Sequence, residues 1–409
     1  MRAREGAVTG TDRRLRILFV SDVYFPRING VSTSIQTFRR ELEALGHQTV
    51  LVAPAYPAAH DDDRDTIRVR SRYVPLDPED RAMRWSELRR LRHVLAGKPF
   101  DLVHVQTPFL AHYAGVRLAR AWAVPCVATY HTLFEEYLGH YVPFAPGVAL
   151  RAAARALSRR QCNDVDAVIV PSIAMRDALE RYGVANRMEI IPTGIPLGDF
   201  ARGDGARFRA RYGIAPRRPM LLFVGRVAFE KNIDFLLRVM VRVQRDLADA
   251  LLVVSGEGPA LKPLRRAAAA AGLGENVLFV GYLDRATTLA DCYRAADAFV
   301  FASRTETQGL VLLEAMALGV PVVSTAVMGT RDIVGPGRGA LVAEDDECDF
   351  ARKVTMLLRS PALRARLAAE AIDYARAWSA PATARRLQDT YFSLRRGSAA
   401  GSVHALQCC

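Results

Sequence analysis

Short runs of β-branched and apolar residues alternate with helical patterns along most of the chain. The first series of runs is RILFVSD, QTVLVAP, DLVHVQ, PCVATYH, AVIVP and MEIIP, with a helical pattern from about residue 31 to 45 that stops at Gly46. A second series begins near residue 219 with MLLFVGR and continues through ALLVVSGEG, NVLFVG, AFVFAS and VPVVS. This alternation predicts βαβ units, in which helices cover both faces of a parallel sheet. The expected fold class is α/β, with two doubly wound, Rossmann-like domains.

The length of 409 residues exceeds what one hydrophobic core usually supports, so two domains are expected. The two series of strands are separated by PTGIPLGDFARGDGARFRARYGIAPRRP, which is rich in Gly, Pro and Arg and predicts a linker. After about residue 345 the pattern is wholly helical. The predicted parts are a disordered N-terminal tail (1–14), a first Rossmann-like domain (15–198), an interdomain linker (199–218), a second Rossmann-like domain (219–378), a helix that packs back on the first domain (379–396) and a disordered tail (397–409).

The charge of the chain is strongly positive, at a formal +13, and only four of its 56 basic residues are lysines. Compositional bias toward arginine explains most of this surplus, although a basic surface also favours anionic partners such as phosphates and acidic lipid headgroups. We expect no nucleic-acid partner, because no stripe of basic residues with interleaved aromatic side chains is present.

The six cysteines show no CxxC spacing, which argues against a zinc site and against a secreted disulfide framework. The first fourteen residues are polar and basic, without the apolar core of a signal peptide. No stretch reaches the roughly 18 uncharged apolar residues of a membrane-spanning helix. We therefore expect a cytoplasmic protein that neither is exported nor spans a membrane.

The turns that follow the strands carry the candidate chemistry, because ligands of doubly wound sheets bind at the carboxyl ends of the strands, here facing a cleft between two domains. Neither SDVYFPRINGVSTS nor VGRVAFEKN contains GxGxxG, so the sequence does not support a binding site for a nicotinamide or flavin dinucleotide. Gly30 either lets backbone N–H groups approach a phosphate at a helix N-terminus or forms a tight turn after Asn29. Arg226 and Lys231 flank a loop directly after a buried strand, where they either reach a diphosphate or remain solvated.

The segment TETQGLVLLEAMALGVPVV places Glu314 inside an apolar helix, which is costly for a carboxylate without a partner. Glu306 lies in the loop before this helix, and Gly309 and Leu310 open it, where free N–H groups favour negative charge. A nucleotide sugar offers a matching partner for each group, with its ribose diol on Glu314 and its hexose hydroxyls on Glu306. The alternative is that Glu314 pairs with a nearby arginine and Glu306 is solvated. We favour the nucleotide sugar, because the basic loop fits its diphosphate and the sequence shows no other partner signal.

Together, the Glu-x7-Glu spacing, the G-R-x4-K loop, the N-G-V turn and the PTGI segment resemble the retaining glycosyltransferases of family four, which have the two-domain glycosyltransferase-B fold. The resemblance covers roughly residues 15 to 395 and is specific for the family but not for its substrates. One departure is Thr193, where relatives commonly have Asn before Gly194. This difference affects a contact of the linker and does not change the resemblance to the family.

The resemblance implies that the first domain faces the acceptor, that the second binds the donor, and that no cofactor or metal takes part. It implies that the donor is bound by Gly30, Gly225, Arg226, Lys231, Glu306, Gly309, Leu310 and Glu314. It implies that the catalytic residues are Glu306, His131, Arg226 and Lys231. Here Arg226 and Lys231 hold the diphosphate, while His131 contacts the donor sugar near the reacting carbon. An ordinary strand-end role for His131 is the alternative, and we expect its closest rival, His104, to be structural.

Two further patterns in the sequence bear on the identity of the acceptor. The four aromatic residues 134, 137, 141 and 144 follow His131, and a helix then presents Arg151, Arg155 and Arg159 on one face. This combination suits peripheral contact with a membrane surface and a lipid acceptor, while a lid helix with a solvated face is the alternative. The only DxD-like run, HDDDRD at 60–65, is expected to be a solvated loop rather than a metal site.

The YHT-x-F-E-x-Y-L and INGVSTSI segments look most like the diacylglycerol α-glucosyltransferase and lipid α-mannosyltransferase branch. The favoured expectation is transfer of glucose from UDP-glucose to a lipid such as diacylglycerol, with retention at the anomeric carbon. The alternative is a GDP-mannose-dependent α-mannosyltransferase acting on a phospholipid or polysaccharide. Two rivals of other classes are a non-catalytic two-lobed sugar-binding module and a nucleotide-sugar epimerase.

Overall fold

The computed structural model describes residues 14–57, 65–74, 77–97, 99–133, 147–200, 203–285 and 287–406. Contacts between residues divide the chain into two compact units, residues 1–129 with 388–409 and residues 130–387, and each is described by itself. The predicted N-terminal tail, the DxD-like run up to residue 64 and the aromatic residues 134–144 lie outside the described residues, apart from Arg14.

The first sheet has seven strands in the order β3-β2-β1-β6-β7-β8-β9. Its strands are β1 (Arg16–Val20), β2 (Gln48–Pro54), β3 (Thr66–Val69), β6 (Leu102–Val105), β7 (Cys126–Thr129), β8 (Ala167–Val170) and β9 (Met188–Ile190). The associated helices are α1 (Gly30–Ala44), α2 (Trp85–Val94), α3 (Leu110–Trp122), α5 (Gly147–Asn163) and α6 (Ile173–Arg181). β1 pairs in parallel with both β2 and β6, as the continuously apolar sequence of these strands predicts. A small antiparallel pair, β4 (Ser71–Val74) and β5 (Asp77–Met83), was not predicted.

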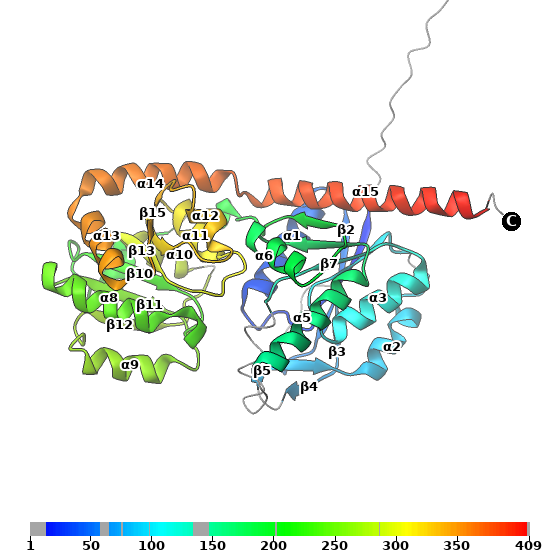
Figure 1. The fold of residues 1–409 in the computed structure, drawn as a ribbon, viewed down its shortest axis with the longest axis horizontal. Coiled ribbons are helices and arrows are strands. Elements are labelled where there is room, and N and C mark those ends of the chain that lie inside the picture. Colours follow the sequence, from blue (N-terminus) through cyan, green and yellow to red (C-terminus); the bar gives the residue numbers. More distant parts are fainter. Residues whose placement is uncertain are drawn as a thin grey trace, which may run out of the picture. The chain divides into compact units, whose positions relative to one another are not determined.

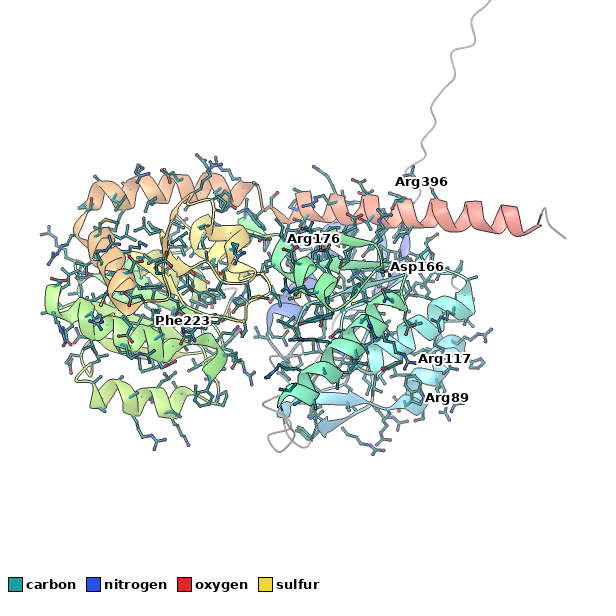
Figure 2. The ribbon with its side chains drawn as sticks, in the orientation of Figure 1. Arg89, Arg117, Asp166, Arg176, Phe223 and Arg396 are labelled. Carbon is teal, nitrogen blue, oxygen red and sulfur yellow. The ribbon has the colours of Figure 1, made fainter. Side chains whose placement is uncertain are left out.

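The second sheet is entirely parallel, in the order β12-β11-β10-β13-β14-β15, and lies among helices in Figure 1. Its strands are β10 (Met220–Val224), β11 (Leu251–Ser255), β12 (Val277–Gly281), β13 (Ala298–Phe301), β14 (Val322–Thr325) and β15 (Ala340–Ala343). Its helices are α7 (Gly205–Arg211), α8 (Ile233–Asp246), α9 (Leu261–Ala270), α10 (Leu289–Ala295), α11 (Leu310–Ala317), α12 (Thr330–Val334), α13 (Glu347–Arg359) and α14 (Pro361–Arg376). Phe223, labelled in Figure 2, is fully buried on β10 and stacks on Phe301 of β13.

Two expectations about irregular segments are wrong. The predicted linker (199–218) contains α7, which Asp204 caps through its side chain, and Phe208 of α7 is 2% exposed in the core. Ile214 is also buried in this core, and the Gly- and Arg-rich composition concealed both apolar residues. The predicted disordered tail (397–409) is helical up to Leu406, because α15 (Ala380–Leu406) continues without a break. The boundaries of the two domains remain predictions.

The start of α15 contacts the segment after β9, where Ala380 N–H donates to the carbonyl of Ile195. Further along α15, Tyr391 is completely buried and its hydroxyl lies 2.6 Å from His104 Nδ1. The other ring nitrogen of His104 lies 2.7 Å from Thr129 Oγ1. Both ring nitrogens are therefore used within the protein, which supports the structural role expected for His104.

Candidate functional site

The order of the second sheet reverses between β10 and β13. From β10 the chain proceeds outward to β11 and β12, and then returns to the other side of β10 to form β13, β14 and β15. In open parallel sheets the loops that leave the two strands at such a reversal diverge and leave room for a ligand. The loop with Arg226 and Lys231 follows β10, and the loop with Glu306 follows β13, so both candidate loops leave the sheet at this point.

The loop after β10 is held by its backbone. Gly225 N–H donates to the carbonyl of Ser255 at 3.0 Å, and Val227 N–H donates to the carbonyl of Glu257 at 2.8 Å. The Arg226 side chain is 38% exposed, and its Nη1 lies 4.0 Å from Glu230 Oε1. The loop therefore presents a partly exposed Arg226 side chain from a fixed backbone.

The loop after β13 leads directly into α11, with Gly309 as the N-cap residue. The carbonyl of Glu306 accepts a hydrogen bond of 2.8 Å from Gly329 N–H, which fixes the loop. The Glu306 carboxylate forms an ion pair with the Lys231 ammonium, and the two side chains are only 17% and 15% exposed. The structure thus brings Lys231 and Glu306 together across the reversal point, beside the N-terminus of α11.

Glu314 is 3% exposed on α11, as its apolar surroundings predict. Its Oε2 accepts a 2.9 Å hydrogen bond from the Tyr293 hydroxyl, and its Oε1 forms an ion pair with Arg285. The alternative that Glu314 pairs with a nearby arginine is therefore confirmed for the described structure, whereas its second part, a solvated Glu306, is wrong because Glu306 pairs with Lys231. Sequence reasoning missed both Tyr293 and Arg285 because they come from α10 and from the loop before it. The available signal was that a buried carboxylate needs donors for both oxygens.

Gln308, one residue before the N-cap of α11, binds the backbone of Thr193, the position at which relatives commonly have Asn. Thr193 N–H donates to Gln308 Oε1 at 2.9 Å, and Gln308 Nε2 donates to the Thr193 carbonyl at 2.8 Å. Both bonds use the backbone of Thr193. The contact is therefore independent of which side chain occupies position 193.

Gly30 belongs to the other unit, where it begins α1. Asn29 caps this helix, with its Oδ1 accepting a 2.8 Å hydrogen bond from Ser32 N–H. A Cβ atom added at Gly30 would meet no described atom within 4 Å, and Gly30 is not among the glycines with positive φ. The tight-turn explanation is thus wrong, because the described structure itself would accept a side chain here.

His131 follows β7 and is half-buried. Burial lowers its pKa to about 4, so the imidazole is neutral at pH 7. A neutral imidazole can exchange hydrogen bonds with a sugar hydroxyl without adding a charge.

Asp22 is a buried residue that the sequence reasoning did not select. It follows β1, is 7% exposed, and accepts hydrogen bonds from Thr107 Oγ1 at 2.8 Å and from Ala111 N–H at 3.1 Å. Burial raises its pKa from 3.8 to about 7, although these hydrogen bonds oppose the shift. Asp22 therefore ties the ends of β1 and β6 to the start of α3 and titrates near neutrality.

The raised pKa of Asp22 predicts a pH-dependent stability. Between pH 3.8 and 7 the folded state retains a proton that the unfolded chain has released, so this contribution is complete below pH 3.8 and is lost as the pH rises to about 7. We expect the wild type to lose about 2 kcal/mol of unfolding free energy between pH 5 and pH 7 relative to Asp22→Asn. Urea denaturation of both proteins at the two pH values measures this. If the unfolding free energies of the wild type and Asp22→Asn differed by the same amount at both pH values, the raised pKa of Asp22 would be contradicted.

Within the described ranges, no group of three or more His, Cys, Asp or Glu residues is arranged to hold a metal ion. In the same ranges, no helix combines the length and the apolar character needed to cross a bilayer. Exposed arginines lie on several helices of the described chain, such as Arg89 on α2, Arg117 on α3 and Arg396 on α15 in Figure 2. Arg151, Arg155 and Arg159 are also exposed, along α5.

Two family models match the chain. The model described as Glycosyl transferases group 1 matches residues 204–374, and that described as Glycosyltransferase Family 4 matches residues 28–199. Together they include both candidate loops of the second sheet and the turn at Gly30.

Curated relatives cover most of the chain. An alpha-monoglucosyldiacylglycerol synthase of Streptococcus pneumoniae is 35% identical over 318 residues, which span 76% of this chain and 71% of that protein. A GDP-mannose-dependent alpha-mannosyltransferase of Mycolicibacterium smegmatis is 30% identical over 370 residues, spanning 89% of this chain and 94% of that protein. Among solved structures, sucrose-phosphate synthase from Thermosynechococcus elongatus has a TM-score of 0.77 at 24% identity, covering 94% of this chain and all of that one. The similarity to sucrose-phosphate synthase, at this identity, shows a shared fold.

Proposed function

Because the chain belongs to the glycosyltransferases of family 4, we propose that it is a retaining hexosyltransferase that uses a nucleoside diphosphate sugar and a membrane-lipid hydroxyl. The observation that carries this proposal is the Lys231–Glu306 pair beside the α11 N-terminus at the reversal of the second sheet. A cation, a helix N-terminus and a carboxylate together match a diphosphate joined to a hexose. The favoured donor is UDP-glucose, and the favoured acceptor is diacylglycerol.

The roles of the residues follow from their charges. Lys231 and Arg226 neutralise the departing diphosphate, so that this proposal requires no divalent metal. On donor binding Lys231 exchanges its contact with Glu306 for phosphate oxygens, and Glu306 becomes free to accept hydrogen bonds from the hexose hydroxyls. The neutral His131 contacts the sugar near the anomeric carbon.

Four further donor contacts are backbone or ribose contacts. Backbone N–H groups of Gly309 and Leu310 face the phosphates, and Glu314 accepts from the ribose diol. Gly225, whose own N–H is bonded to the Ser255 carbonyl, lets the donor approach its backbone closely. Gly30, where the described structure leaves space for a side chain, allows close approach of the ligand.

The transfer keeps the configuration of the anomeric carbon. The acceptor oxygen forms its bond to that carbon on the face from which the diphosphate departs, as the bond to the phosphate oxygen breaks. The acceptor proton passes to the departing phosphate. Stabilising the negative charge of this leaving group is the main catalytic task of the protein.

The proposed acceptor rests on the relatives and on α5. The relative in Streptococcus pneumoniae is named for a glycolipid, and the exposed arginines of α5 suit contact with acidic headgroups on the cytoplasmic face of a membrane. GDP-mannose is the second candidate donor, because the mannosyltransferase relative matches over nearly its whole length.

Calorimetry with UDP-glucose and GDP-mannose tests the proposal. We expect one donor to bind the wild type, and Glu314→Ala to weaken that binding at least tenfold, because the ribose diol loses its acceptor. Glu347→Ala is the matched control, since it removes a carboxylate that pairs with Arg238 elsewhere in the same unit. If the folded wild type binds neither donor, the proposal is wrong.

A further inference from the structure

The two oxygens of Glu314 have partners of different kinds. Tyr293 comes from α10, is fully buried, and lies with its ring 5.8 Å from that of Phe299. Burial keeps the pKa of Tyr293 well above its ordinary value, so the hydroxyl remains a donor to Oε2. Tyr293 is thus a fixed partner that holds the carboxylate in one orientation.

Arg285, the partner of Oε1, differs in both exposure and position. It comes from the loop between β12 and α10, and its side chain is 31% exposed, whereas that of Glu314 is 4% exposed. A long, partly exposed arginine can return its guanidinium to water at a modest cost, while a buried tyrosine cannot leave the core. Of the two partners, Arg285 is therefore the exchangeable one.

We propose that Arg285 occupies the ribose position of the ligand-free protein and is displaced when the donor binds. This inference rests on the proposed function, in which the ribose diol donates to Glu314. A buried carboxylate oxygen without a donor is costly, so Arg285 keeps Oε1 satisfied until two hydroxyl groups replace it. The diol then binds at the cost of one ion pair, and Arg285 lowers donor affinity instead of raising it.

The decisive measurement is whether removal of the Arg285 side chain strengthens or weakens nucleotide binding. We expect Arg285→Ala to bind the preferred nucleotide, UDP or GDP, about tenfold more tightly than the wild type by calorimetry. Binding of inorganic pyrophosphate, which has no ribose, should change less than twofold. Because loss of a positive charge ordinarily weakens binding of an anion, tighter binding cannot come from general electrostatics.

Arg238→Ala is the matched control for this variant. Arg238 also pairs with carboxylates, those of Asp234 and Glu347, and its loss removes the same charge from the same unit. We expect Arg238→Ala to leave nucleotide binding unchanged or slightly weaker. Thermal unfolding of both variants verifies that they remain folded.

Tyr293→Phe tests the fixed partner as a positioning residue. Without the hydroxyl, Glu314 is no longer held toward the ribose, so nucleotide binding should weaken about fivefold while pyrophosphate binding is unchanged. A role confined to folding would alter both ligands together or neither.

Two results would overturn the proposal. Weaker nucleotide binding by Arg285→Ala would make Arg285 a ligand of the donor, and unchanged binding would mean that the ion pair does not compete with it. Both differ from failure of the proposed function, in which the wild type itself binds neither nucleotide and this inference falls with it.

Discussion

Lys231→Ala is expected to lower kcat at saturating donor by about a thousandfold, because the departing diphosphate loses one of the two cations proposed to neutralise it. The effect on folding should be small, since the Lys231–Glu306 pair retains some solvent contact and its loss costs about 1 kcal/mol. Turnover of the donor with diacylglycerol vesicles, together with thermal unfolding, measures the two effects separately.

Lys353→Ala is the matched control, because Lys353 is another of the four lysines and pairs with Asp349 in the same unit. It should keep turnover within twofold of the wild type. Lys231→Arg tests geometry, and we expect only partial recovery, since a planar guanidinium does not replace a compact ammonium. If Lys231→Ala retained more than a tenth of wild-type turnover, its assignment to the leaving group would be wrong.

Gly256→Ala is expected to destabilise the protein by at least about 4 kcal/mol and to abolish donor binding. Gly256 has φ +134°, and a Cβ atom there would lie 1.9 Å from the Gly225 carbonyl oxygen. Neither backbone can yield easily, because Gly225 N–H is bound to Ser255 and Gly256 N–H to Gly281. The clash would move the loop that presents Arg226 and Lys231.

Gly274→Ala provides the comparison, since a Cβ atom at that exposed position would meet no described atom within 4 Å. We expect its unfolding free energy to stay within about 0.5 kcal/mol of the wild type. Urea denaturation of both variants measures the difference. A Gly256→Ala protein as stable as Gly274→Ala would contradict the close packing of the two loops.

The regular part of the fold could be predicted because parallel strands buried on both faces must be continuously apolar. MLLFV, LLVVS and AFVF show this pattern, and each forms a strand of the second sheet. β5, with the sequence DPEDRAM, could not be recognised, because it begins with acidic residues and a proline, which are depleted in strands. The short strand ALVA of β15 was missed because four residues between glycines and acidic residues carry too little pattern.

For the candidate site, the sequence by itself determined that basic and acidic residues follow two strands of the second domain, and that Glu314 lies in an apolar helix. Local composition and spacing were sufficient for these conclusions, since a loop after a strand and the face of a helix are properties of short segments. Only the tertiary structure decided that Lys231 pairs with Glu306, and that Arg285 and Tyr293 pair with Glu314. These partners are 75, 29 and 21 residues apart. The physical reason is that a charge is satisfied by whichever donor the folded chain brings within reach, and spacing along the sequence does not specify that donor.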